Sequence, residues 1–121
     1  MKMNITVVAG GKCIYWDFNG QVVKKTYSES LIGYEILPDE SGIVLLEPIS
    51  EAGSENAVIY NLDGSKRWRL KFPSDLSQGI IFDRVGVSNG KLIVIGIVDG
   101  RDVRFEVDYN GLRYINYTAE R

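Results

Sequence analysis

Short apolar runs rich in Val, Ile and Tyr recur along the whole chain and are separated by clusters of Gly, Asn, Asp and Ser. Helical periodicity is hard to find in these runs, whereas their composition and their boundaries are typical of β-strands. We therefore predict an all-β protein with about eleven strands. They are expected near Ile5–Ala9, Cys13–Phe18, Gln21–Tyr27, Leu31–Leu37, Ile43–Pro48, Ala57–Leu62, Lys66–Phe72, Ile80–Val87, Lys91–Val98, Val103–Tyr109 and Leu112–Tyr117.

The residues between the predicted strands indicate antiparallel hairpins. Asn-Gly or Asp-Gly pairs stand between apolar runs at 19–20, 63–64, 89–90, 99–100 and 110–111. Such pairs supply the positive φ that tight hairpin turns require, and connections this short cannot make parallel crossovers. We predict an antiparallel meander, in which Gly20, Gly64 and Gly111 occupy equivalent turns. Residues 51–56 are expected to form another hairpin tip.

A five-residue pattern occurs three times: a large apolar residue, Asp or Asn, a large apolar residue, Asn or Asp, and Gly. The copies are Trp16-Asp17-Phe18-Asn19-Gly20, Tyr60-Asn61-Leu62-Asp63-Gly64 and Val107-Asp108-Tyr109-Asn110-Gly111, with glycines 44 and 47 residues apart. This period is the length of a four-stranded propeller blade. It groups the strands into three blade-like repeats, about 5–27, 31–72 and 80–117.

The second copy continues to Trp68, and the segment 58–68 resembles the repeat of quinoprotein-type β-propellers. In that family an acidic turn with glycine is followed four residues later by a tryptophan that docks one blade on the next. The resemblance implies this docking role for Trp68. The other two copies have Lys24 and Ile115 at the corresponding position, and the resemblance covers no cofactor-binding residues.

Three blades are fewer than the four to eight of a closed propeller. We expect a single domain over residues 1–121, either a truncated or open propeller-like meander or a sandwich or barrel. A ring completed by homo-oligomerisation is one alternative. Another is that the repeated pattern is only a good hairpin turn used three times.

The absence of histidine narrows the chemistry. The chain has no histidine, which removes the commonest general base, the commonest zinc ligand and every Ser-His or Cys-His pair. Phosphate-binding glycine loops and esterase motifs are absent as well. The Asp and Asn residues of the repeated turns are expected to bond their own backbone rather than calcium. We predict a protein that is not an enzyme and has no metal and no cofactor, with paired carboxylates as the remaining catalytic alternative.

Cys13 is the only cysteine, which fits a reducing compartment. The apolar run near the N-terminus is shorter than a secretory signal requires, and no run approaches the length of a membrane span. We therefore expect a cytoplasmic protein that does not bind membranes.

Charge is distributed unevenly along the chain. Residues 26–65 contain eight acidic residues and no Lys or Arg, whereas the rest of the chain holds all 14 basic residues and eight acidic ones. An acidic face repels nucleic acid and steers basic proteins inward. The alternative is that these acids are scattered over several solvent-exposed faces.

We hypothesise a non-catalytic protein-binding module, specifically an immunity-type inhibitor that neutralises a basic toxin or nuclease, as compact acidic bacterial immunity proteins do. The candidate partner-binding residues are Asp39, Glu40, Glu47, Glu51 and Glu55. A carbohydrate- or small-ligand-binding module using exposed Trp and Tyr side chains is the alternative. The basic stretch 66–71 contains Trp68, but we expect no nucleic-acid partner because the net charge is −2.

Overall fold

The structure, a computed structural model, describes residues 3–76 and 79–119 and confirms the all-β prediction. Residues 1–2 and 120–121 of the expected domain lie outside the described part. The described strands are β1 (Ile5–Val8), β2 (Cys13–Phe18), β3 (Gln21–Thr26), β4 (Gly33–Ile36), β5 (Gly42–Leu46), β6 (Ala57–Asn61), β7 (Lys66–Arg69), β8 (Gly79–Ser88), β9 (Lys91–Val98), β10 (Arg101–Asp108) and β11 (Arg113–Ala119).

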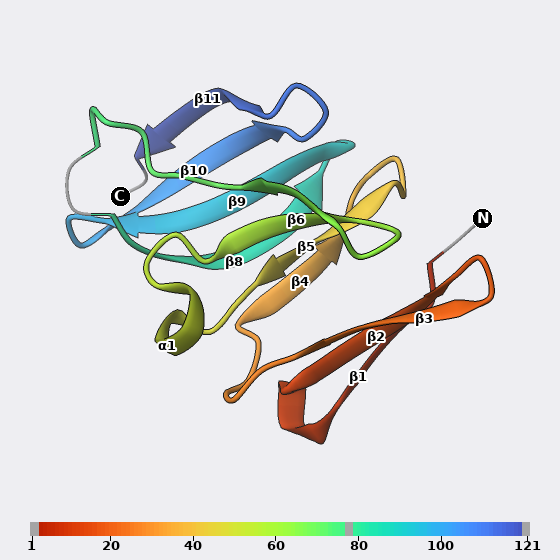
Figure 1. Ribbon diagram of the computed structural model, residues 1–121. Coiled ribbons are helices and arrows are strands. Elements are labelled where there is room, and N and C mark those ends of the chain that lie inside the picture. Colours follow the sequence, from red (N-terminus) through yellow and green to blue (C-terminus); the bar gives the residue numbers. More distant parts are fainter. Residues whose placement is uncertain (1–2, 77–78, 120–121) are drawn as a thin grey trace.

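The strands form three open antiparallel sheets, which removes the closed-barrel alternative. The N-terminal sheet has the order β1-β2-β3, the central sheet β4-β5-β6-β7, and the C-terminal sheet β11-β10-β9-β8. Figure 1 shows the central sheet, coloured from orange (β4) to green (β7), between the red and orange N-terminal sheet and the teal to blue C-terminal sheet. Each sheet is a meander because strands that are consecutive in the sequence pair with one another.

The central sheet is buried on both faces. On β5, Ile43 and Leu45 pack toward the N-terminal sheet with Trp16, whereas Val44 and Leu46 belong to the core shared with the C-terminal sheet. Every residue of β5 is buried. This is why β5 reads as a continuous apolar run rather than as alternating apolar and polar positions.

Trp68 lies on β7 between the central and C-terminal sheets, half-buried, with its ring centroid 5.5 Å from that of Tyr114 on β11. Trp68 therefore packs where these two sheets meet, and the docking role that the resemblance implied stays a prediction. The strand ends at Arg69, three residues earlier than predicted, because the chain then turns into the core. Phe72 stacks on Phe82 of the C-terminal sheet at 4.2 Å between ring centroids.

The glycine turns are not all equivalent. Gly20 and Gly64 have positive φ, 78° and 89°, as predicted. At the third copy the prediction of positive φ is wrong, because Leu112 adopts it instead, with φ 57°. The Asp108 carboxylate accepts a 2.8 Å hydrogen bond from the backbone N–H of Gly111, and this longer turn places the left-handed residue one position later.

The expected hairpin tip at 51–56 is also more structured than predicted. A single helical turn, α1 (Ile49–Ala52), follows Pro48, and the backbone N–H groups of Glu51 and Ala52 each donate a 3.0 Å hydrogen bond to the Pro48 carbonyl. The turn ends at Gly53, which has a φ of 75°. The chain then returns to the sheet through Asn56, which is fully buried.

Candidate functional site

The five candidate acids lie at opposite ends of the central sheet. Asp39 and Glu40 are in the turn between β4 and β5, whereas Glu47, Glu51 and Glu55 belong to the connection between β5 and β6. The five residues of β5 separate the two groups, a distance of roughly 17 Å along the strand. Figure 1 shows α1 and the β4–β5 turn at opposite ends of the sheet. The structure therefore groups three of the candidates and places the other two apart from them.

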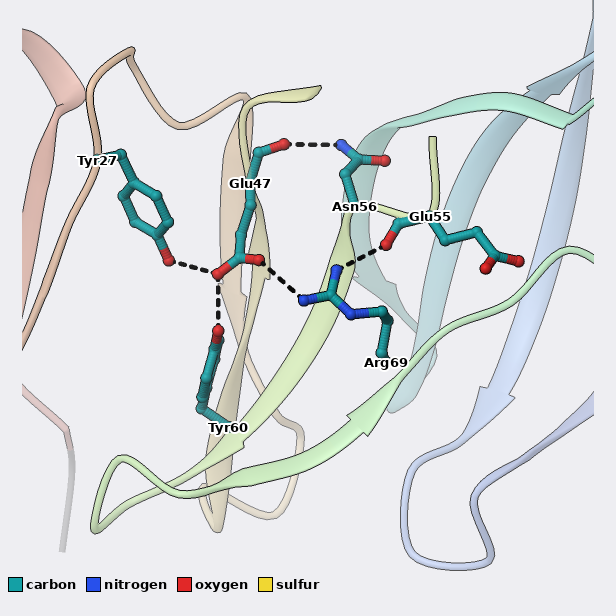
Figure 2. Close-up of polar contacts among 6 residues, drawn as sticks. All are labelled: Tyr27, Glu47, Glu55, Asn56, Tyr60 and Arg69. Carbon is teal, nitrogen blue, oxygen red and sulfur yellow. Dashed lines mark hydrogen bonds and ion pairs between the residues drawn. The ribbon is translucent and has the colours of Figure 1, made fainter. Parts of the chain in front are cut away.

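Glu47 differs from the other candidates because it is buried, with 6% of its surface exposed. One carboxylate oxygen accepts hydrogen bonds from the hydroxyls of Tyr27, at 2.6 Å, and Tyr60, at 2.7 Å. The other oxygen lies 3.7 Å from the guanidinium of Arg69. Figure 2 shows these three side chains converging on the carboxylate. Its charge is thus held inside the protein, between the N-terminal and central sheets.

The surroundings of Glu47 keep the two tyrosines protonated. Burial raises the pKa of the Tyr27 hydroxyl, and the hydrogen bond to Glu47 raises it further. The pKa of Tyr60 is raised by the same two causes, in the same order. A negative phenolate beside a buried carboxylate would be unfavourable, so both hydroxyls remain hydrogen-bond donors over the ordinary pH range.

Glu51 and Glu55 connect this end of the sheet to neighbouring segments. The exposed Glu51 accepts a 2.8 Å hydrogen bond from the backbone N–H of Ser28, which follows the N-terminal sheet. The half-buried Glu55 accepts one of 2.9 Å from the backbone N–H of Phe72, and its own carbonyl accepts one of 2.9 Å from Arg69. These two acids therefore fix local structure and also present charge to solvent.

Asn56 joins the central sheet to the C-terminal sheet from a fully buried position. Its side-chain amide donates hydrogen bonds to the carbonyls of Glu47, at 3.0 Å, and Phe82, at 2.9 Å. Its side-chain oxygen accepts one of 2.8 Å from the backbone N–H of Phe82. Both N–H groups of this buried side-chain amide are therefore hydrogen-bonded.

At the opposite end, Asp39 supports its own turn. Its carboxylate accepts hydrogen bonds from the backbone N–H of Ser41, at 3.0 Å, and from the Ser41 hydroxyl, at 2.6 Å. Partial burial favours the neutral acid, but the hydrogen bonds from Ser41 outweigh it and lower the pKa of Asp39. Glu40 is exposed, and its backbone has a positive φ of 58°. Both carboxylates of this turn are therefore at the surface.

The aromatic side chains do not form an exposed platform. Among the 13 aromatic residues, all of them in the described part of the chain, Tyr34 is the one that is exposed. Trp16 is 1% exposed, and its indole N–H donates a 2.7 Å hydrogen bond to the carbonyl of Leu62 in the central sheet. The aromatics therefore serve mainly to pack one sheet on the next.

The predicted bonding of the repeated turns to their own backbone is confirmed for Asp63 and Asp108, in the second and third copies. The Asp63 carboxylate accepts from the backbone N–H of Ser65 at 2.9 Å, and the Asp108 carboxylate accepts from the backbone N–H of Gly111. Within residues 3–76 and 79–119, no group of three His, Cys, Asp or Glu side chains is placed to hold a metal ion. The same residues contain no helix long and apolar enough to cross a membrane.

Sequence reasoning missed the partners of Glu47, which are Tyr27, Tyr60 and Arg69. From the sequence, Glu47 is predicted to be a partner-binding acid because it lies in the segment 26–65, which has no basic residue. One indication was present, because Glu47 stands at the end of the apolar run 43–46 and directly before Pro48. A carboxylate inside such a run is buried with its neighbours and needs hydrogen-bonding partners.

No protein-family model and no curated protein matches this chain. A chain in a solved structure, described as "Structure of Tne2 in complex with Tni2", has a similar fold, with a TM-score of 0.66. The two chains are 13% identical, and the match covers 90% of this chain and 77% of the other. At this identity, the similarity shows a shared fold.

Proposed function

We propose that this protein is a non-catalytic protein-binding module, and specifically an immunity-type inhibitor that neutralises a basic toxin or nuclease. The observation that carries the proposal is the segment 26–65, which has eight acidic residues and no basic one. Five of these acids are exposed in the structure: Glu29, Asp39, Glu40, Glu51 and Asp63. The segment therefore places exposed carboxylates at both ends of the central sheet.

Such a surface suits a basic protein partner. Complementary potentials raise the association rate and disfavour partners of like charge. In this proposal Asp39, Glu40, Glu51 and Glu55 present the charge that the partner meets. Glu47, with its carboxylate enclosed by Tyr27, Tyr60 and Arg69, acts from within by holding the structure beneath the surface.

The structural comparison supports a protein partner. The chain with the similar fold comes from a structure of two proteins bound to each other, Tne2 and Tni2. A fold of this kind thus occurs in a protein–protein complex. A non-catalytic role is supported by the lack of histidine and by the use of both oxygens of the most buried carboxylate, Glu47, in internal contacts.

The test begins with the gene next to the one that encodes this chain, since an immunity protein is expected beside its toxin. We expect the neighbouring product to be basic, to inhibit growth when expressed alone and to be neutralised when this protein is co-expressed. The proposal would be contradicted if the product of the adjacent gene does not bind this protein. It would also be contradicted if that product binds at a rate that does not depend on the acidic side chains.

Association kinetics then test the acidic surface. A fourfold amide variant removes four charges and keeps a hydrogen-bond acceptor at each position. Its substitutions are Asp39→Asn, Glu40→Gln, Glu51→Gln and Glu55→Gln. We expect slower association at low salt and a weaker dependence on ionic strength. The matched control removes four charges outside the segment, at Asp17, Asp75, Asp99 and Glu106, and is expected to associate much as the parent does. Equal slowing by both variants would show that only net charge matters.

A further inference from the structure

A shallow groove lies where the three sheets meet at the α1 end of the molecule. Its walls are the linker that follows the N-terminal sheet, the residues around α1 and the start of β8. Four apolar residues line it: Ile32, Pro48, Ile49 and Ile81. Two of them project into solvent, since Ile32 is 39% exposed and Ile49 is 51% exposed. Large aliphatic side chains that converge on one hollow are typical of a protein-binding surface.

Hydrogen bonds hold the linker in place. The Ser30 hydroxyl donates to the carbonyl of Gly10 at 2.5 Å, and the backbone N–H of Leu31 donates to the carbonyl of Gly11 at 2.8 Å. The backbone N–H of Ile32 donates to the carbonyl of Leu46 at 2.8 Å, so the linker is tied to the N-terminal sheet and to the central sheet. One wall of the groove is therefore set before any partner arrives.

Two further contacts join this wall to the wall formed by α1. Ser28 of the linker donates its backbone N–H to Glu51 of α1, and Tyr27 donates its hydroxyl to Glu47, two residues before α1 begins. Tyr27 and Glu47 directly precede the two wall segments, 28–32 and 48–52. A groove that is already formed costs little ordering on binding, which favours affinity.

The charge around the groove indicates what it accepts. Glu29 lines the groove and Glu51 lies on α1, and both are exposed. The two wall segments contain no Lys or Arg. A basic group is therefore favoured beside the groove and an apolar group within it.

We propose that this groove is where the partner docks, by seating one aliphatic or aromatic side chain of a basic segment between Ile32 and Ile49, with flanking Lys or Arg side chains beside Glu29 and Glu51. This inference rests on the proposed function and specifies its binding surface. It places the contact at the α1 end, so Asp39 and Glu40, at the far end of β5, attract the approaching partner without contacting it. Glu47 and Tyr27 are positioning residues that keep the two walls together.

Two synthetic peptides of equal charge test the groove directly. One is acetyl-Arg-Lys-Leu-Lys-Arg-amide and the other has Ser in place of Leu. Each is titrated into the isotopically labelled full chain while backbone amide chemical shifts are recorded at low salt. We expect the shifts to concentrate in residues 29–32 and 48–52, and the Leu peptide to bind about five-fold more tightly, since half-burying a leucine contributes about 1 kcal/mol.

Matched variants separate the groove from general hydrophobicity. Ile49→Ser is expected to abolish the preference for the Leu peptide. Ile115→Ser is the control, because Ile115 on β11 is 52% exposed, nearly the same as Ile49, and lies away from the groove. The control variant is expected to keep the preference.

Three results would overturn the inference: shifts centred on residues 37–41, equal affinity for the two peptides, or no shifts with either peptide. Its failure is distinguishable from failure of the proposed function. If a basic partner protein binds the Ile49→Ser variant as tightly as the parent but binds the fourfold amide variant poorly, the groove proposal is wrong and the proposed acidic binding surface is supported. If the partner binds both variants as it binds the parent, both the groove proposal and the proposed function are contradicted.

Discussion

The Tyr27 hydroxyl donates a 2.6 Å hydrogen bond to the Glu47 carboxylate, and this contact joins the end of the N-terminal sheet to the end of β5. Tyr60 and Arg69 contact the same carboxylate from β6 and β7. The connection that carries α1 is thus fixed by side chains from two sheets. The segment 51–56, which the sequence predicts to be a hairpin tip, is therefore held in place by contacts of the buried Glu47 carboxylate.

We expect Glu47→Ala to be strongly destabilising. The substitution removes the ionic partner of the partly exposed Arg69 and leaves two tyrosine hydroxyls without an acceptor, at a cost of about 2 to 4 kcal/mol. Urea unfolding followed by tryptophan fluorescence measures the loss. Glu40→Ala, at an exposed position, is the control and is expected to change the free energy of unfolding by less than about 0.5 kcal/mol. Equal midpoints for the two variants would contradict the network.

The two tryptophans should differ in their contribution to stability. Trp16 is 1% exposed and Trp68 is half-buried, so Trp16→Ala is expected to cost about 5 kcal/mol and Trp68→Ala about 3 kcal/mol, the ends of the range for core aromatics. Chemical denaturation of both variants gives the order. A Trp68→Ala midpoint within error of the parent would place this residue at the surface and would argue against its docking role.

Asn56→Leu should weaken the contact between the central and C-terminal sheets. It removes three hydrogen bonds and leaves the N–H and carbonyl of Phe82 without these partners, at a cost of about 2 to 4 kcal/mol. Hydrogen exchange reports where the loss occurs. We expect the amide of Phe82 to lose protection by more than amides within the N-terminal sheet, and uniform loss over all three sheets would contradict a local role.

Alkaline pH should destabilise the protein. Tyr27 and Tyr60 have pKa values raised above the unfolded value of about 10, so both states are protonated below that pH and stability is unaffected there. Above about pH 10, unfolded chains release protons that the folded protein retains, and the free energy of unfolding falls as pH rises. Tyr114, with a pKa raised mainly by burial, adds to the same trend.

Urea midpoints between pH 8 and about 11.5 check this prediction. Tyr27→Phe is expected to be less stable at neutral pH, since it loses the hydrogen bond to Glu47, and to show a shallower decline at high pH. A parent midpoint that stays constant to the top of this range would show that the tyrosines titrate normally in the folded state.

Much of the fold could be predicted from local pattern. The strands follow from apolar runs and the hairpins from Asn-Gly and Asp-Gly pairs, and both depend on interactions between residues close in the chain. Boundaries were less accurate where packing intervenes. The β7 strand ends at Arg69 because Phe72 leaves the sheet to stack on Phe82, and no local pattern encodes a contact with a residue ten positions later.

The candidate site was only partly predictable. Asp39, Glu40, Glu51 and Glu55 could be selected as acids of a segment without basic residues. The burial of Glu47 could not, because it depends on Tyr27, Tyr60 and Arg69, which come from three separate places in the chain. The groove beside α1 could not be predicted either, because its walls are formed by residues that are far apart in the sequence.

By itself, then, the sequence determined the all-β class, the antiparallel meander and the uneven charge, since alternation, turn chemistry and composition act over a few residues. Only the tertiary structure decided that β5 is buried on both faces, that the acids divide between two ends of one sheet, and that Glu47 lies inside. These features depend on which sheet faces which, and that arrangement is set by the packing of side chains distant in sequence, such as Trp16 against the carbonyl of Leu62.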